Sequence, residues 1–196
     1  VWKRTYNSPE NLAYSTVEFN YAKNGVWLTI PNPGIPGPNN TMHDIRHMSL
    51  STDGIGKSIV VWDANTFGIT SIHMCQYLGA QSQGYAYNLD QSNDPSRQVY
   101  SPRIAMASDG SALAVWLREV NGVFRVVCMP YVDGLWRDEY LRLIDFDGSA
   151  PDRHLAVAVD VGGKAVVVWG EGNKDSAGVV RRRIFARRAK DFRVVQ

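Results

Sequence analysis

The sequence contains few of the residues on which metal, redox and disulfide chemistry depend. Its 196 residues include only two cysteines, Cys75 and Cys128, and four histidines. Two cysteines are too few for a disulfide framework or a zinc site, and the histidines show no metal-ligand spacing. The sequence also has no Ser-His-Asp or Cys-His arrangement and no glycine-rich phosphate loop. We therefore expect no metal and no other cofactor.

Long apolar runs and a strong excess of one charge are missing as well. No stretch of about 18 apolar residues occurs, so the sequence predicts no transmembrane segment. The net charge of +2 is too small for a nucleic-acid-binding polycation. The chain starts at Val1, inside an apparent strand, without an initiating Met. We expect a fragment, or a chain from which an N-terminal part was removed.

What the sequence does contain is a heptapeptide in three versions. They read GKSIVVW at 56–62, GSALAVW at 110–116 and GKAVVVW at 163–169. The closing residues Trp62, Trp116 and Trp169 are separated by 54 and 53 positions. A fixed period of this length is typical of repeat architectures.

Each heptapeptide lies within a set of short alternating segments. An apolar segment and an Asp/Gly-rich turn precede it, at 46–54, 102–110 and 153–163, and two further short strands follow it. Such spacing is typical of β-propeller blades, and also of β-sandwiches. Sandwiches do not usually repeat a heptapeptide at equal spacing. The sequence therefore predicts an all-β fold, a β-propeller of four-stranded antiparallel blades with about 3.5 blades present.

We expect one propeller portion over the whole chain. It divides into a partial blade with a Pro/Gly linker at 1–42 and blades at 43–100, 101–151 and 152–196. The repeated Trp should be buried between neighbouring blades. Because propellers typically close with four to eight blades, we expect a larger propeller or closure against another chain.

Three segments resemble the repeats of bacterial secreted and surface β-propeller proteins, loosely those of the sialidase-like families. They read STDGIGKSIVVW, ASDGSALAVW and AVDVGGKAVVVW. Ser51, Asp53 and Gly56 match part of the sialidase Asp-box, but the Trp comes later, no Thr precedes it, and Ala107 replaces Asp in one copy. The resemblance implies an extracytoplasmic location: periplasmic, cell-surface or secreted.

Basic side chains stand near the starts of the predicted inner strands. They are Arg46, His47, Arg103, Arg153 and His154. If the blades are equivalent, these residues recur around one mouth of the central axis. Guanidinium groups bind oxyanions bidentately, so such a ring is a candidate site for a carboxylate, sulfate or phosphate. The alternative is a solvated basic rim.

The C-terminal segment is strongly basic. Residues 171–196 contain eight Lys or Arg and three acids. The candidate partner-contact residues are Arg181, Arg182, Arg183, Arg187 and Arg188. A solvated sheet edge is the alternative. Nucleic acid is not favoured, because the interleaved aromatics of a single-strand binder are missing.

These features favour a non-enzymatic binding or scaffold module of an extracytoplasmic assembly. Its partners would be other protein subunits or a second copy of the chain. The alternative is a carbohydrate-active module, either a lectin or a sialidase-like hydrolase, with a glycan as ligand. The sequence favours binding over catalysis and names no catalytic residue, because no spacing singles out a tyrosine nucleophile with a supporting carboxylate.

Overall fold

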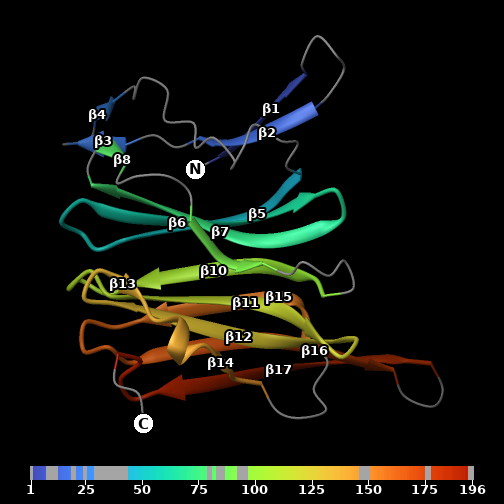
Figure 1. The fold of residues 1–196 in the computed structure, drawn as a ribbon. Coiled ribbons are helices and arrows are strands. Elements are labelled where there is room, and N and C mark those ends of the chain that lie inside the picture. The colour runs from blue at the N-terminus through green and yellow to red at the C-terminus, as the bar shows by residue number, and fades with distance from the viewer. Residues whose placement is uncertain are drawn as a thin grey trace.

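The chain folds into a series of small antiparallel sheets. The computed structural model describes residues 2–7, 13–18, 21–23, 26–28, 44–78, 81–82, 87–91, 97–145, 151–174 and 178–193. Figure 1 shows the sheets stacked one on another, from the N-terminal strands at one end to β17 at the other. The linker expected within 1–42 lies outside the described residues. The division of the chain into blades at the expected boundaries stays a prediction.

The N-terminal residues form two short hairpins. Strand β1 (Trp2–Asn7) pairs with β2 (Ala13–Glu18), and β3 (Tyr21–Lys23) pairs with β4 (Val26–Leu28). Strand β2 lies against β5, the first strand of the next sheet.

Two larger sheets follow, and they are built alike. The first has the order β5 (Asp44–Thr52), β6 (Lys57–Thr66), β7 (Ile69–Leu78), with β8 (Gln81–Ser82) and β9 (Tyr87–Gln91) both paired with β7. The second has the order β10 (Val99–Met106), β11 (Ala112–Val120), β12 (Val123–Val132), with β13 (Leu135–Trp136) and β14 (Arg142–Leu143) both paired with β12.

The outermost position of both sheets therefore differs from the single fourth strand that the sequence suggested. It is divided between two short strands, and in the second sheet a 3-10 turn, η2 (Asp138–Tyr140), lies between them. Short, interrupted edge strands offer few unpaired backbone groups to another chain. The third sheet has the order β15 (Pro151–Val159), β16 (Ala165–Lys174), β17 (Val180–Ala189) among the described residues.

The core lies between the sheets. The central strands β6 and β11 are apolar along most of their length because neighbouring sheets cover both of their faces. As expected, the repeated tryptophans are buried, with exposed fractions of 3% for Trp62, 0% for Trp116 and 1% for Trp169. The Nε1 of Trp116 donates to Asp90 of the preceding sheet over 2.6 Å. The Trp116 indole therefore contributes both core packing and a hydrogen bond between the first and second sheets.

An aspartate side chain holds the turn before β6 and the turn before β16. Asp53 Oδ1 accepts hydrogen bonds from the backbone N–H groups of residues 55, 56 and 57, and Asp160 Oδ1 accepts two in the corresponding turn. This is the structural reason for the Asp-rich part of the repeat.

The inner strands β5, β10 and β15 run side by side, with β10 in contact with both of the others. Strands β5 and β10 do not pair through their backbones. Instead, two serine hydroxyls of β5 accept hydrogen bonds from backbone N–H groups of β10. Ser49 Oγ accepts from the backbone N–H of Ile104 over 3.2 Å, and Ser51 Oγ accepts from Met106 over 3.0 Å. The inner edge of the second sheet is thereby paired with the first.

Candidate functional site at the bulged ends of the inner strands

Each inner strand carries an irregularity near its start. In β5, Arg46 and His47 lie opposite the single residue Asp63, between the pairs Ile45↔Ala64 and Met48↔Trp62. The register of β10 shifts between Tyr100 and Arg103, and that of β15 between Pro151 and Leu155. Such bulges redirect side chains and are common beside functional sites. Ser49 and Ser51 accept from Ile104 and Met106 in that order, so β5 and β10 run in the same direction and their bulges lie at the same end of the two strands.

The first bulge holds a His–Asp pair. The backbone N–H of His47 donates to Asp63 Oδ1 over 2.7 Å, and His47 Nδ1 lies 2.9 Å from Asp63 Oδ2. The carboxylate side chain is 2% exposed, whereas the imidazole is 32% exposed. A buried carboxylate bonded to Nδ1 favours the tautomer with its proton on that nitrogen, which leaves Nε2 as an acceptor. This imidazole is therefore oriented to hydrogen-bond a ligand.

Arg46 and Tyr100 stand near this pair. Arg46 is exposed, and its Nε donates to Asp44 Oδ2 over 2.8 Å. That hydrogen bond is the main reason why the pKa of Arg46 is raised, and the neighbouring Tyr100 and Asp63 add to the effect. The Tyr100 ring packs at a tilt against Phe124, with centroids 5.6 Å apart. The bulged end of β5 and β10 thus combines a fixed cation, an oriented imidazole and an aromatic pair.

Arg103 and His154 lie in a second place at the inner strands. Both line a groove of about 500 Å3 that also includes Arg182 and Arg183. The Nη1 of Arg103 donates to the carbonyl of Pro102 over 2.8 Å. His154 is exposed. Arg153 belongs to β15, but its side chain lies outside the described residues.

The strand register shows how the predicted basic residues relate to each other. Arg103 pairs with Val115, as Ser49 pairs with Val61, so these two inner-strand residues occupy equivalent positions. Arg46 comes earlier on its own strand, inside the bulge. The structure therefore brings Arg103 and His154 to one groove and places Arg46 and His47 in the first bulge. A single anion-binding ring stays a prediction.

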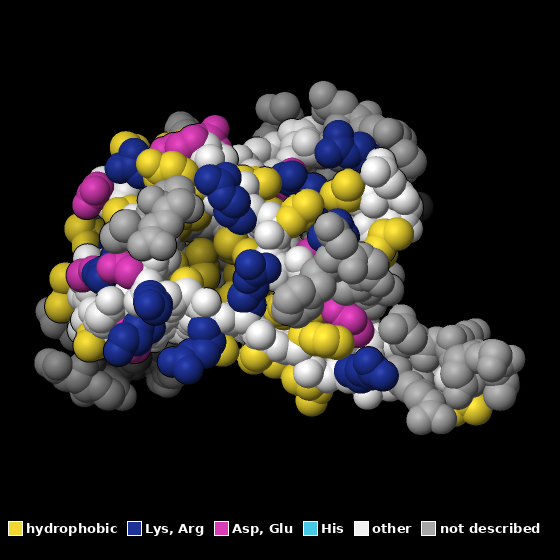
Figure 2. Space-filling view, turned by 90° about the horizontal axis from the view of Figure 1, so that it is seen from below, with side chains coloured by type: hydrophobic (Ala, Val, Ile, Leu, Met, Phe, Trp, Pro, Cys, Tyr) yellow, Lys and Arg dark blue, Asp and Glu magenta, His cyan; other side chains and the backbone are white. Residues whose placement is uncertain are grey.

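The arginines of the C-terminal segment lie on β17 and are exposed. This holds for Arg182, Arg183, Arg187 and Arg188, whereas the side chain of Arg181 lies outside the described residues. Figure 2 views this end of the molecule and shows Lys and Arg side chains around hydrophobic patches. Arg187 Nη1 donates to the carbonyl of Ile144 over 3.0 Å, so this arginine contacts the preceding sheet.

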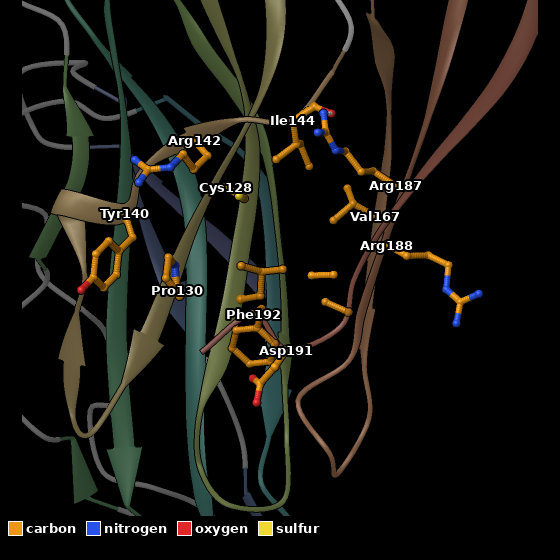
Figure 3. A pocket seen from close by; sticks show the side chains of 13 residues that line it. Cys128, Pro130, Tyr140, Arg142, Ile144, Val167, Arg187, Arg188, Asp191 and Phe192 are labelled. Atoms are coloured by element: carbon orange, nitrogen blue, oxygen red, sulfur yellow. Dashed lines mark hydrogen bonds between the residues drawn. The ribbon is translucent and has the colours of Figure 1, made fainter. Parts of the chain in front are cut away.

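A small, mainly apolar cavity lies between the second and third sheets, near Arg187. It measures about 210 Å3, and its lining includes Cys128, Val167 and Phe192 (Figure 3). Burial raises the pKa of the Cys128 thiol to about 11. The thiol therefore stays protonated at neutral pH and is a poor nucleophile. Among the described residues, no group of His, Cys, Asp and Glu is suited to hold a metal ion.

Sequence reasoning missed Asp63 and Ser101. Asp63 is an acid in an otherwise apolar strand, directly after the repeated Trp, and this was the available signal. Ser101 is fully buried with a φ of 55°, and its Oγ has no hydrogen-bond partner among the described residues. The Ser-Pro dipeptide at the start of the predicted segment 102–110 was the available signal.

No family model and no curated protein matches this chain. Among the described residues, no helix is long and apolar enough to cross a membrane.

Three solved structures of fungal enzymes are similar. One is the GH93 α-L-arabinofuranosidase of Fusarium graminearum with arabinobiose, at 14% identity and a TM-score of 0.59 over 97% of this chain and 62% of that one. Another is the α-L-arabinanase of Penicillium chrysogenum with arabinobiose, at 12% identity and a TM-score of 0.60 over 98% and 63%. The E242A mutant of the arabinofuranosidase Arb93A of Fusarium graminearum, with an iminosugar inhibitor, matches at 13% identity and a TM-score of 0.56 over 98% and 63%.

The chain thus spans slightly less than two thirds of the length of these enzymes. At this level of identity the similarity establishes the fold and not the activity. The sheets described above are antiparallel blades of a partial β-propeller, as the repeats predicted.

Proposed function

We propose that the chain is a glycan-binding part of a carbohydrate-active β-propeller, with the glycan at the bulged ends of β5 and β10. The observation that carries this proposal is the similarity of nearly the whole chain to propeller structures that contain arabinobiose or an iminosugar. It favours the carbohydrate-active alternative over the non-enzymatic scaffold that the sequence favoured. The extracytoplasmic location that the repeats implied is part of the same proposal.

The chemistry of the first bulge fits a neutral or acidic sugar. Sugar hydroxyls need directional partners, and the His47 imidazole, held by Asp63, supplies one. Arg46 supplies further donors beside it. The Tyr100 and Phe124 rings add an aromatic surface at the same end of the sheets.

The described residues support binding rather than hydrolysis. Glycoside hydrolysis uses two carboxyl groups on either side of the bond that is cleaved. Here Asp63 is bonded to His47 and Asp44 is bonded to Arg46. Both carboxylates therefore already accept hydrogen bonds from neighbouring side chains. Any catalytic role of the whole protein would need carboxylates from elsewhere.

Calorimetric titration of the 196-residue chain with arabinobiose tests the proposal. We expect saturable binding that His47→Ala and Arg46→Ala each weaken by about tenfold or more, equivalent to about 1.4 kcal/mol. Lys164→Ala is the matched control, because Lys164 is exposed in the turn at the opposite end of the inner strands and should leave affinity unchanged. Absence of binding to arabinobiose and to every member of a glycan array would refute the proposal.

A further inference from the structure

One face of the third sheet is open, although the same face of the two preceding sheets is buried. The strand register identifies the equivalent positions. The pairs are Asp63↔Ile72, Leu117↔Val126 and Gly170↔Ile184, each one residue after the repeated Trp. Ile72 and Val126 are 0% exposed, whereas Ile184 is 82% exposed. One structural position is thus part of the core twice and exposed to water once.

The burial in the first two sheets has a specific cause. Ile72 packs in a cluster with Trp116 of the second sheet, and Val126 packs in a cluster with Trp169 of the third sheet. Each sheet is therefore covered by the Trp-bearing face of the next one. The centre of the open face is apolar, as in the covered faces, with Val168 and Ala186 beside Ile184. Part of the groove of about 500 Å3 runs along it.

This open face also carries a defined charge. Arg182 and Arg188 flank Ile184 on the same side of β17, and both are exposed. At the equivalent position to Arg188, the earlier sheets have Gln76 and Pro130. No carboxylate lies on this face among the described residues of β16 and β17. An apolar centre flanked by two unneutralised arginines is suited to a partner that has carboxylates at its rim.

A second copy of the chain does not supply the matching surface from its described sheets. The faces that cover a neighbour are centred on a Trp, and Trp62, Trp116 and Trp169 are each 3% exposed or less. Two open faces placed against each other would bring four arginines together. The occupant must therefore present a Trp-centred face, and in these three sheets every such face is already buried.

We propose that the open face of β16 and β17 binds a further propeller blade from polypeptide outside these 196 residues. That blade is an antiparallel sheet with a Trp-centred apolar surface and carboxylates opposite Arg182 and Arg188. The arrangement continues the interface that already joins the first sheet to the second and the second to the third.

Site-specific photo-crosslinking tests this assignment. The photoreactive residue p-benzoylphenylalanine replaces Ile184, or, as the matched control, Ile55, which is 84% exposed in a turn. Each variant is irradiated in an extract of the native source, and the crosslinked peptides are sequenced by mass spectrometry. Circular dichroism melting curves check that both variants are folded.

We expect position 184 alone to crosslink to a strand outside residues 1–196 that belongs to a Trp-ending repeat. The double substitution Arg182→Glu and Arg188→Glu should lower this yield about tenfold at 0.15 M salt, whereas Lys190→Glu should not. Crosslinks to residues 1–43 of a second copy would identify that copy as the occupant and overturn the proposal. Equal yields from positions 184 and 55, no product at all, or only peptides without such a repeat would overturn it too.

Discussion

Asp63 shows how a single residue combines a structural and a functional position. It occupies a site where the next sheet has Leu117 and the last has Gly170, so nothing in the fold requires an acid there. Its burial is tolerated because the carboxylate accepts hydrogen bonds from both the backbone and the ring of His47. The sequence predicted His47 as a candidate ligand residue. It could not predict the partner, because the two are 16 positions apart and meet only through strand pairing.

Cys128 gives a pH-dependent prediction at the residue scale. Its thiol is half-buried between two sheets, and burial raises its pKa to about 11. In the unfolded chain the thiol has its ordinary, lower pKa. Protonated Cys128 therefore favours the folded state, and this contribution is complete below about pH 8.5 and is lost as the pH rises toward 11.

Urea unfolding of the wild type and of Cys128→Ala at pH 8 and pH 10.5 measures this effect. The wild type should lose more stability between the two pH values than the variant, in which no thiol titrates at this position. In the native protein at pH 8, Cys128 should also react with a thiol reagent far more slowly than in urea. Equal pH dependence of the two proteins would contradict the prediction.

At the scale of elements, the turn between β15 and β16 is tied to the C-terminal residues. Arg193 donates to Asp191 over 2.8 Å, to Asp109 of the second sheet over 2.6 Å and to the carbonyl of Gly162 over 2.9 Å. This guanidinium closes over Gly163, whose φ is +79°. A Cβ at this glycine would lie 2.5 Å from Arg193 and Asp191 atoms.

Replacing Gly163 by Ala should therefore destabilise the protein more than the same change at Gly122. Gly122 has nearly the same backbone geometry, with a φ of +77°, but a Cβ there would meet no atom within 4 Å. Both substitutions carry the cost of a left-handed alanine, about 1–2 kcal/mol. Only Gly163→Ala also displaces Arg193. Urea denaturation of the two variants compares the costs, and equal losses would show that the Arg193 contacts contribute nothing.

The elements themselves divide into those that a pattern can predict and those that it cannot. The alternation before each Trp predicted β5, β10 and β15, because a strand buried on one side has a period of two. The outermost strands were predicted poorly. A single fourth strand was expected in each blade, but in the second sheet Leu135–Trp136 and Arg142–Leu143 pair separately with β12, and Asp138–Tyr140 between them forms a 3-10 turn. An edge segment is fixed by few neighbours, so its sequence restricts its conformation weakly.

At the scale of the whole molecule, neighbouring sheets contact each other far more than distant ones. Stability in such an architecture depends on each sheet and on its interfaces with its neighbours. The first and second sheets have neighbours on both faces, whereas the third has one covered face. The molecule should therefore open from the end that holds β17.

Hydrogen exchange of the free chain tests this order. Backbone amides of β16 and β17 should exchange faster than those of β6 and β11, because partial opening of the third sheet exposes less apolar surface than opening of a central one. Mass spectrometry of peptides from the four strands gives the rates. If all four strands are protected equally, the sheets unfold together and the expected gradient is wrong.

The repeats predicted the architecture of the whole chain, and the reason is physical. The regular Trp spacing indicates a structural unit that is repeated along the chain. The type of blade can therefore be predicted from this spacing alone, without knowing which distant residues touch. The function did not follow in the same way. Arg46 and Arg103 looked equivalent in the sequence, but the register of the strands separates them. Bulges in the strands decide which charged residues come together. The alternation of apolar and polar residues in the sequence does not show where the bulges are.

Those bulges have a consequence for how repeated units diverge. In the bulges of β5 and β10, two residues lie opposite one residue of the neighbouring central strand. In β15, three residues lie opposite Gly170. After the bulge, all three inner strands pair with their central strands in the same register. The bulge thus absorbs a change in length that would otherwise move every following side chain to the wrong face. After duplication, insertions and substitutions at this one place could accumulate without disturbing the core. A propeller of this kind is able to acquire new chemistry at the bulged ends of its inner strands while its core stays unchanged.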